Sequence, residues 1–183
     1  MDRDTELELV AGLKGGDERA FDRVYEEYRP RLFSFVLRLV GRREVAEELS
    51  QEAWLRLATR ACALRDDTRL APWLFTVARN LCASLLRARG LDLARTVDPA
   101  DLGLPGGDTT PAGELRWRLE RAMARLPTHY REALLLVGVE GLTQVEAAAV
   151  CGVRPEALRK RVERARNLLA AELGEDRPRA THR

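Results

Sequence analysis

The chain has 183 residues, of which 45% are hydrophobic and 33% charged, and its formal net charge is only +2. This composition favours a folded helical protein with one domain or two small ones, in which nucleic-acid binding would depend on segregated charge. Neither a signal-peptide pattern nor a run of about 18 apolar residues is found, so we expect an intracellular protein without membrane insertion.

Cysteine and histidine, which often build catalytic or metal sites, are sparse, with three cysteines and two histidines. Cys62, Cys82 and Cys151 are too far apart for a metal knuckle, and an odd number argues against a disulfide framework. Cys82 and Cys151 are typical of small buried hydrophobes. His129 and His182 lack a nearby nucleophile pattern, and no phosphate-binding loop is found. The sequence predicts no enzyme, no metal and no cofactor.

The first 41 residues predict two helices. Thr5 and Glu8 have capping-box spacing, and a glycine pair ends the helix that they begin. Asp17 can cap the second helix. Pro30 should kink or restart that helix, which Gly41 closes.

Residues 43–60 predict a helix with an acidic first half. Its inward face is predicted to hold Val45, Leu49, Trp54, Leu57 and Ala58. The outward positions of the first half include Glu44, Glu47, Glu48, Gln51 and Glu52. Acidic residues near a helix N-terminus are partly explained by the helix dipole. A surface for a partner is the sharper explanation.

A polar loop over residues 61–70 precedes a helix that Pro72 should open. One face of this helix is apolar. The other carries Thr76, Arg79, Asn80, Ala83 and Arg87. Spacing alone leaves open whether this stripe of donors binds a ligand or only meets solvent.

Periodicity fades over residues 91–111, where proline, glycine and aspartate are frequent, so this stretch predicts a linker and a domain boundary. Fully extended, about 20 residues would span on the order of 70 Å. Two helices should follow before Gly141. The apolar positions of the first are Leu115, Leu119, Ala122, Met123 and Leu126.

Residues 141–169 predict a helix-turn-helix. Thr143 and Glu146 form a capping box, Gly152 stops the first helix, and Pro155 suits the first turn of the second. From residue 154 to 166 the second helix carries six basic and two acidic residues. Such a face either enters a major groove lined by phosphates or is an ordinary solvated basic surface.

Together these segments resemble a bacterial RNA polymerase sigma factor of the extracytoplasmic-function (ECF) group in the sigma-70 family. The resemblance covers nearly the whole chain and rests on the order of GDERAFDRVYEEYRPRLFSFVLRLVG, AEELSQEAWLRL, WLFTVARN and LPTHYREALLLVGVEGLTQVEAA. It implies an all-α fold with two small helical domains joined by a flexible linker. The expected divisions are a region 2-like domain at 1–90, the linker at 91–111, a region 4-like domain at 112–174 and a tail at 175–183.

The resemblance also assigns residues to three contacts. Those expected to bind core polymerase are Glu48, Leu49, Gln51, Glu52 and Leu55. At the minus-ten element, the loop residues expected to shape a pocket for an extruded base are Leu64, Arg65, Asp66, Asp67 and Thr68, and those expected to meet the strand are Thr76, Arg79, Asn80 and Arg87. At the minus-thirty-five element, base edges would be read by Arg159, Lys160 and Glu163, and phosphates held by Arg154, Arg161 and Arg164.

The implied function is transcription initiation, in which the protein binds core RNA polymerase, directs it to promoter duplex DNA, and helps melt it through the non-template strand. An anti-sigma factor is a further expected partner. The alternatives are a helix-turn-helix regulator that acts without polymerase and a sigma-like protein that only sequesters partners. Ser84, the pair Ala147-Ala148 and Pro155 depart from the family's usual residues, so the resemblance does not assign a promoter sequence.

Overall fold

The computed structural model describes residues 1–90, 97 and 110–175, and within these residues all regular structure is helical. The front module, residues 1–90, contains α1 (Arg3–Lys14), α2 (Glu18–Val40), α3 (Arg43–Arg60), the short 3₁₀ turn η1 (Ala61–Ala63) and α4 (Leu70–Ala88). The rear module, residues 110–175, contains α5 (Pro111–Arg125), α6 (Thr128–Leu134), the π-helical turn η3 (Leu135–Val139), α7 (Gln144–Cys151) and α8 (Pro155–Glu175). None of these helices is long and apolar enough to cross a bilayer.

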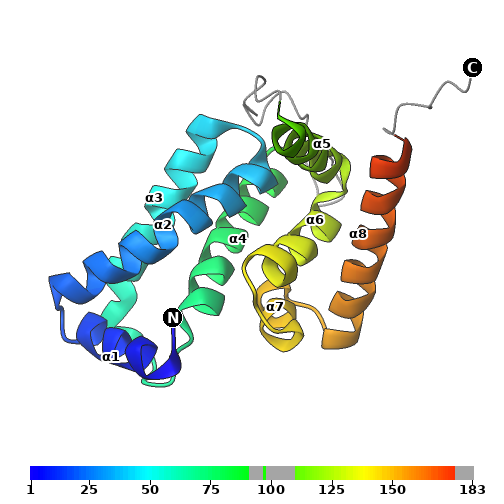
Figure 1. Cartoon of the computed structure of the whole chain (residues 1–183). Coiled ribbons are helices and arrows are strands. Elements are labelled where there is room, and N and C mark those ends of the chain that lie inside the picture. Colours follow the sequence, from blue (N-terminus) through cyan, green and yellow to red (C-terminus); the bar gives the residue numbers. More distant parts are fainter. Residues whose placement is uncertain (91–96, 98–109, 176–183) are drawn as a thin grey trace, which may run out of the picture.

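The front module packs α2, α3 and α4 along one another, and α1 crosses one end of that bundle (Figure 1). Asp2 and Asp17 cap α1 and α2 by accepting backbone hydrogen bonds. Phe35 of α2 and Phe75 of α4 meet edge to face at 5.1 Å between ring centroids, and both side chains are fully buried. Large apolar side chains therefore fix how α2 and α4 lie.

The rear module ends in the predicted helix-turn-helix. Thr143 and Glu146 form the complete capping box at the start of α7, and Gly152 closes that helix with a φ of 65°. Leu158, Val162 and Ala165 of α8 are buried against the rest of the module. The outward face of α8 is left to the charged residues.

Four expectations about the front module were wrong in detail. The first helix does not begin with a capping box of Thr5 and Glu8, because α1 begins at Arg3 and Asp2 is its N-cap. Pro30 does not restart a helix, because α2 runs through it without interruption and the proline ring lies on the exposed side. Pro72 does not open α4, which begins two residues earlier at Leu70. Ala58 faces solvent, whereas Val45, Trp54 and Leu57 are buried as predicted.

In the rear module, Leu115 and Leu119 do not face the core. They are 58% and 40% exposed, together with Trp117 at 40%. Within α5 the buried residues lie in the last turn, at Ala122, Met123 and Ala124. The apolar pattern predicted the helix correctly, but it did not predict that the apolar residues of its first half would be exposed.

The two modules share one interior. The buried apolar cluster runs from α1–α4 into α6–α8, and α4 packs against α7 (Figure 1). The linker expected over 91–111 lies mostly outside the described residues, but Val97 is buried, its N–H donates to the Ala124 carbonyl at 3.0 Å, and α5 already begins at Pro111. A Cβ on Gly41, whose φ is 79°, would approach Val97 to 2.5 Å.

Candidate functional site

The outward face of α3 presents the residues expected to bind polymerase. Glu48, Gln51 and Leu55 are exposed, with Leu55 57% accessible, while Leu49 and Glu52 are half-buried beside them. Their spacing of three and four places them on one side of the helix. Leu55 is thus an exposed leucine among the carboxylates and the amide of this face.

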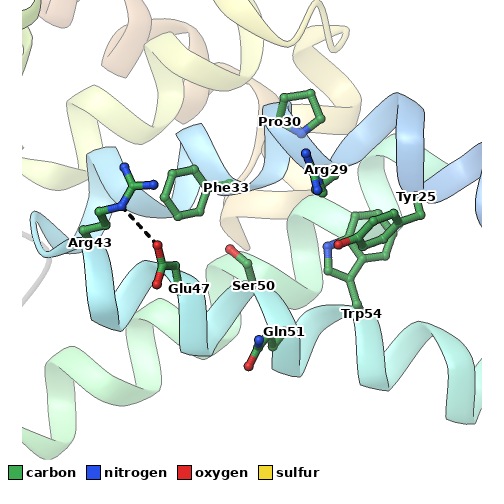
Figure 2. Close-up of a pocket in the computed structure, with 9 residues that line it drawn as sticks. All are labelled: Tyr25, Arg29, Pro30, Phe33, Arg43, Glu47, Ser50, Gln51 and Trp54. Atoms are coloured by element: carbon green, nitrogen blue, oxygen red, sulfur yellow. Dashed lines mark ion pairs between the residues drawn. The ribbon is translucent and has the colours of Figure 1, made fainter.

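A hollow of about 490 Å³ lies between α2 and α3 next to this face (Figure 2). Its walls and rim are formed by Tyr25, Arg29, Pro30, Phe33, Arg43, Glu47, Ser50, Gln51 and Trp54. The Tyr25 and Trp54 rings meet edge to face at 4.9 Å, and Arg43 pairs with Glu47 at 3.1 Å. Sequence reasoning missed the hollow because it joins two helices; Gln51 alone belongs to both it and the predicted contact.

The loop between η1 and α4 forms a tight turn with exposed charges. The N–H of Thr68 donates to the Arg65 carbonyl at 3.0 Å, and the Arg65 guanidinium donates to both carboxylate oxygens of Asp67 at 3.0 Å. A hydrogen bond from Lys14 lowers the pKa of Asp66. Leu64 is buried, so four of the five expected loop residues are accessible in this structure.

Two of the four strand-contact candidates on α4 face solvent. Asn80 and Arg87 are exposed. Arg79 instead turns toward the rear module, where its Nε donates to the fully buried carboxylate of Glu132 at 2.7 Å. The Thr76 hydroxyl donates to the Pro72 carbonyl at 2.7 Å within its own helix. Module packing therefore covers part of the stripe.

Glu132 sits among groups from several helices. Burial raises its pKa, although Arg79 opposes that shift. Burial also raises the pKa of Cys82 and of Cys151 to about 12, with Glu132 adding to both shifts. Both thiols therefore stay protonated at neutral pH, and the interpretation as small buried hydrophobes holds. Cys62 is exposed.

The predicted duplex-reading face on α8 is accessible. Arg154, Arg159, Lys160, Glu163 and Arg164 are exposed, and Arg161 is half-buried.

A hollow of about 400 Å³ opens on this face. It is lined by Tyr130, Lys160, Arg161, Glu163, Arg164 and Asn167. Sequence reasoning missed Asn167, which helical spacing from Glu163 and Arg164 could have suggested. It also missed Tyr130, which lies on α6, where no spacing connects it to α8.

Comparison with known families gives two matches in the expected order. The model for Sigma-70 region 2 matches residues 24–91, and the model for Sigma-70, region 4 matches residues 116–169. Together they cover more than half of the chain.

Curated relatives align over most of their length. The ECF RNA polymerase sigma factor EcfG of Rhodopseudomonas palustris is 36% identical over 148 residues, which is 78% of each chain. The ECF RNA polymerase sigma factor SigM of Mycobacterium tuberculosis is 30% identical, over 93% of this chain and 85% of its own.

Solved structures agree. The sigma factor RpoE of Bartonella quintana, solved with the anti-sigma factor NepR, has a TM-score of 0.67 at 27% identity and covers 86% of this chain and 98% of its own. CnrH, solved with the cytosolic domain of CnrY, has a TM-score of 0.71 at 22% identity and supports the fold alone. The family expected from the sequence is thereby confirmed: the chain belongs to the ECF group of the sigma-70 family of bacterial RNA polymerase sigma factors.

Proposed function

We propose that this transcription initiation factor divides its work among three separate surfaces. The outer face of α3 docks on core polymerase, the loop 64–68 with α4 holds the melted non-template strand, and α8 reads the minus-thirty-five duplex. The observation that carries this proposal is that each surface has exposed residues and its own chemistry. The α3 face is acidic with an exposed leucine, the loop is a charged turn, and α8 is basic.

Within these surfaces we assign roles residue by residue. Glu48, Leu49, Gln51, Glu52 and Leu55 contact polymerase. Arg159, Lys160 and Glu163 face base edges, since arginine and lysine suit guanine acceptors and glutamate can accept from cytosine N4. Arg154, Arg161 and Arg164 hold phosphates, and Tyr130 and Asn167 extend this surface because they share its hollow.

The minus-ten surface requires a change in the arrangement of the modules. For Arg79 to reach a DNA strand, its ion pair with Glu132 must break, and the packing of α4 on α7 must open with it. Asn80 and Arg87 are already exposed and need no such change. We therefore infer that the modules separate when the protein engages polymerase and a promoter. The front module would span residues 1–90, and the DNA-reading part of the rear module would span residues 112–174.

The source of the catalytic chemistry, the cellular location and the inhibition of the protein follow from its partners. The polymerase supplies the synthetic chemistry and this chain none of its own, and the protein works in the cytoplasm, where bacterial promoter DNA lies. An anti-sigma factor would hold it inactive, as the complex of the Bartonella quintana relative with NepR suggests.

The test is run-off transcription with purified core polymerase, the full chain and a library of candidate promoters. Specific transcripts that depend on this chain are expected. A regulator acting alone would instead bind duplex DNA tightly without polymerase, and a sequestering protein would give no transcript from any promoter; either result would reject the proposal.

A further inference from the structure

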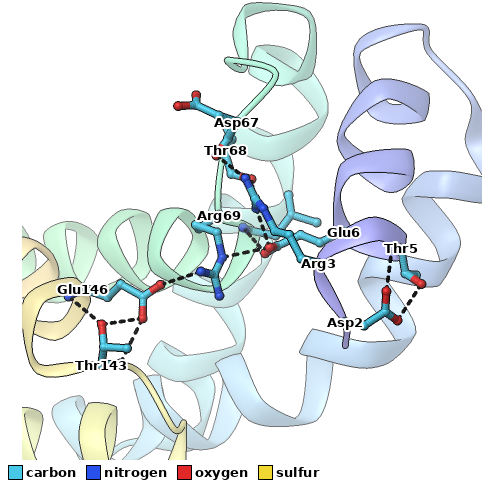
Figure 3. Close-up of polar contacts among 10 residues, drawn as sticks. Asp2, Arg3, Thr5, Glu6, Asp67, Thr68, Arg69, Thr143 and Glu146 are labelled. Carbon is cyan, nitrogen blue, oxygen red and sulfur yellow. Dashed lines mark hydrogen bonds and ion pairs between the residues drawn. The ribbon is translucent and has the colours of Figure 1, made fainter.

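Glu6 of α1 caps a helix to which it does not belong (Figure 3). The residue is only 4% exposed, and its Oε1 accepts a hydrogen bond from the backbone N–H of Leu70 at 2.8 Å. Leu70 is the first residue of α4, and Arg69 at the N-cap position provides no side-chain cap. Because the first N–H groups of a helix lack partners within it, α4 takes its cap from α1.

The other carboxylate oxygen of Glu6 forms ion pairs with two arginines. Its Oε2 accepts from Arg3 at 2.7 Å and from Arg69 at 2.8 Å (Figure 3). Arg3 also donates to the backbone carbonyl of Asp67 at 2.9 Å and reaches the carbonyl of Thr68 at 3.4 Å. A buried carboxylate is stable only with such partners, and here the same contacts fix the backbone at the C-terminal end of the loop.

A second contact from α1 holds the loop at another point. Lys14, in the last turn of α1, forms an ion pair with Asp66. The loop is thus tied to α1 at Asp66, at Asp67 and Thr68, and at the start of α4. The helix α1 lies outside residues 24–91, the part matched by the region 2 model.

We propose that Glu6 is a positioning residue for the strand-holding loop. By capping α4 and organising Arg3 and Arg69, it sets where the loop ends and how its exposed side chains are presented to an extruded base. Binding sites lose function when supporting contacts let them move by fractions of an ångström, so a buried supporting residue can control a site that it does not touch. The inference rests on the strand-holding role proposed for residues 64–68.

The test uses holoenzyme assembled from core polymerase and the full chain. The probe is a fluorescein-labelled single strand carrying the minus-ten sequence selected from a randomised promoter library. A second strand is abasic at the position with the strongest selected base preference. Glu6→Ala should weaken binding of the intact strand about tenfold and of the abasic strand less than twofold, because only the base pocket is misplaced.

Two further variants sharpen the result. Glu6→Gln keeps an oxygen for the Leu70 N–H but loses the charge that holds the arginines, so its loss should be intermediate. Glu8→Ala changes an exposed glutamate on the same helix and should bind both strands as the unchanged protein does. Affinities for core polymerase and for minus-thirty-five duplex should stay within about twofold in all variants.

Two outcomes would overturn the inference. Unchanged discrimination between intact and abasic strands in Glu6→Ala would exclude a positioning role. Equal losses for both strands, for core polymerase and for duplex, with a lowered melting temperature, would reduce Glu6 to a fold-stabilising residue. Failure of the underlying function would look different: the unchanged holoenzyme would not discriminate between the strands, and Asp67→Ala would have no effect on binding.

Discussion

The front and rear modules meet through opposite charges, and each module carries the other sign of charge on its outward helix. The front module is basic at the interface and acidic on α3, whereas the rear module is acidic at the interface and basic on α8. Four ion pairs among the described residues join the modules, and in each the arginine belongs to the front module and the glutamate to the rear. They are Arg31–Glu140, Arg38–Glu120, Arg69–Glu146 and Arg79–Glu132. The rear module is therefore acidic toward the front module and basic along α8. A carboxylate at the interface occupies a guanidinium to which a promoter phosphate could otherwise bind.

Among the ion pairs that join the modules, the largest effect should come from Glu132→Ala. The substitution leaves a cavity and deprives Arg79 of its buried partner, so the free energy of unfolding should fall by about 2 kcal/mol, a value reduced because Arg79 keeps some contact with solvent. Urea titration measures the change. Glu172→Ala removes a more exposed pair with Arg125 inside the rear module and should cost about 0.5 kcal/mol or less. Equal losses of unfolding free energy in the two variants would mean that the pair between the modules stabilises the protein no more than a surface pair does.

On the opposite side of the rear module, the double variant Lys160→Ala with Arg164→Ala should lose duplex affinity by tenfold or more and lower the salt slope by about 1 to 2, because a lysine and an arginine leave a surface that faces DNA. Fluorescence anisotropy of holoenzyme on promoter duplex at several salt concentrations measures both quantities. Arg23→Ala, at an exposed position of α2, is the matched control. An unchanged slope would move the duplex surface away from α8.

Charge reversal tests the packing of the modules without touching a buried residue of either core. Glu120→Arg places two cations together at Arg38, which should shift the balance between packed and separated modules by about 1 to 2 kcal/mol, or roughly tenfold. Small-angle scattering should then give a larger radius of gyration. Adding Arg38→Glu restores opposite charges and should return the compact value. If it does not, this pair does not govern packing.

Two glycines with nearly the same positive φ separate backbone strain from packing. Gly41→Ala should lower the free energy of unfolding by about 2 kcal/mol, because a left-handed alanine costs about 1 kcal/mol and its Cβ also collides with Val97. Gly16 has a φ of 77° and open space around it, so Gly16→Ala should cost about 1 kcal/mol. Thermal melting of both variants gives the difference. Identical melting temperatures would mean that Val97 moves aside freely.

A change of pH should have the smallest effect on the packing of the modules. Burial raises the pKa of Glu132, which faces Arg79 and Cys82 of α4, Cys151 of α7 and Arg161 of α8, so packing the modules favours its protonated form. Packing should therefore be stronger below the ordinary glutamate pKa and weaken as pH rises through the raised value. Scattering between pH 7.5 and about 5 should show slight compaction, and Glu132→Gln should reduce that change. A compaction that Glu132→Gln leaves intact would assign it to other groups.

The sequence was most informative where one helix alone determines the outcome. The capping box at Thr143 and Glu146 predicted the start of α7, and the basic run from Arg154 to Arg166 predicted an exposed face on α8. Local spacing could not reveal contacts between distant segments. It placed Arg79 with Asn80 on one stripe, but of these two the rear module covers only Arg79. Nothing in the spacing of α5 indicated that Leu115 would be 58% exposed.

Val97 has a consequence for the geometry of promoters. While it stays docked on Ala124, only residues 89–96 join α4 to the rear module, and eight residues reach on the order of 30 Å at full extension. If Val97 leaves Ala124, the segment that connects α4 to α5 has more than twice that number of residues. Val97 thus sets two possible lengths for the connection between the modules, so the same protein could bridge promoter elements at a fixed short separation or tolerate a wider one.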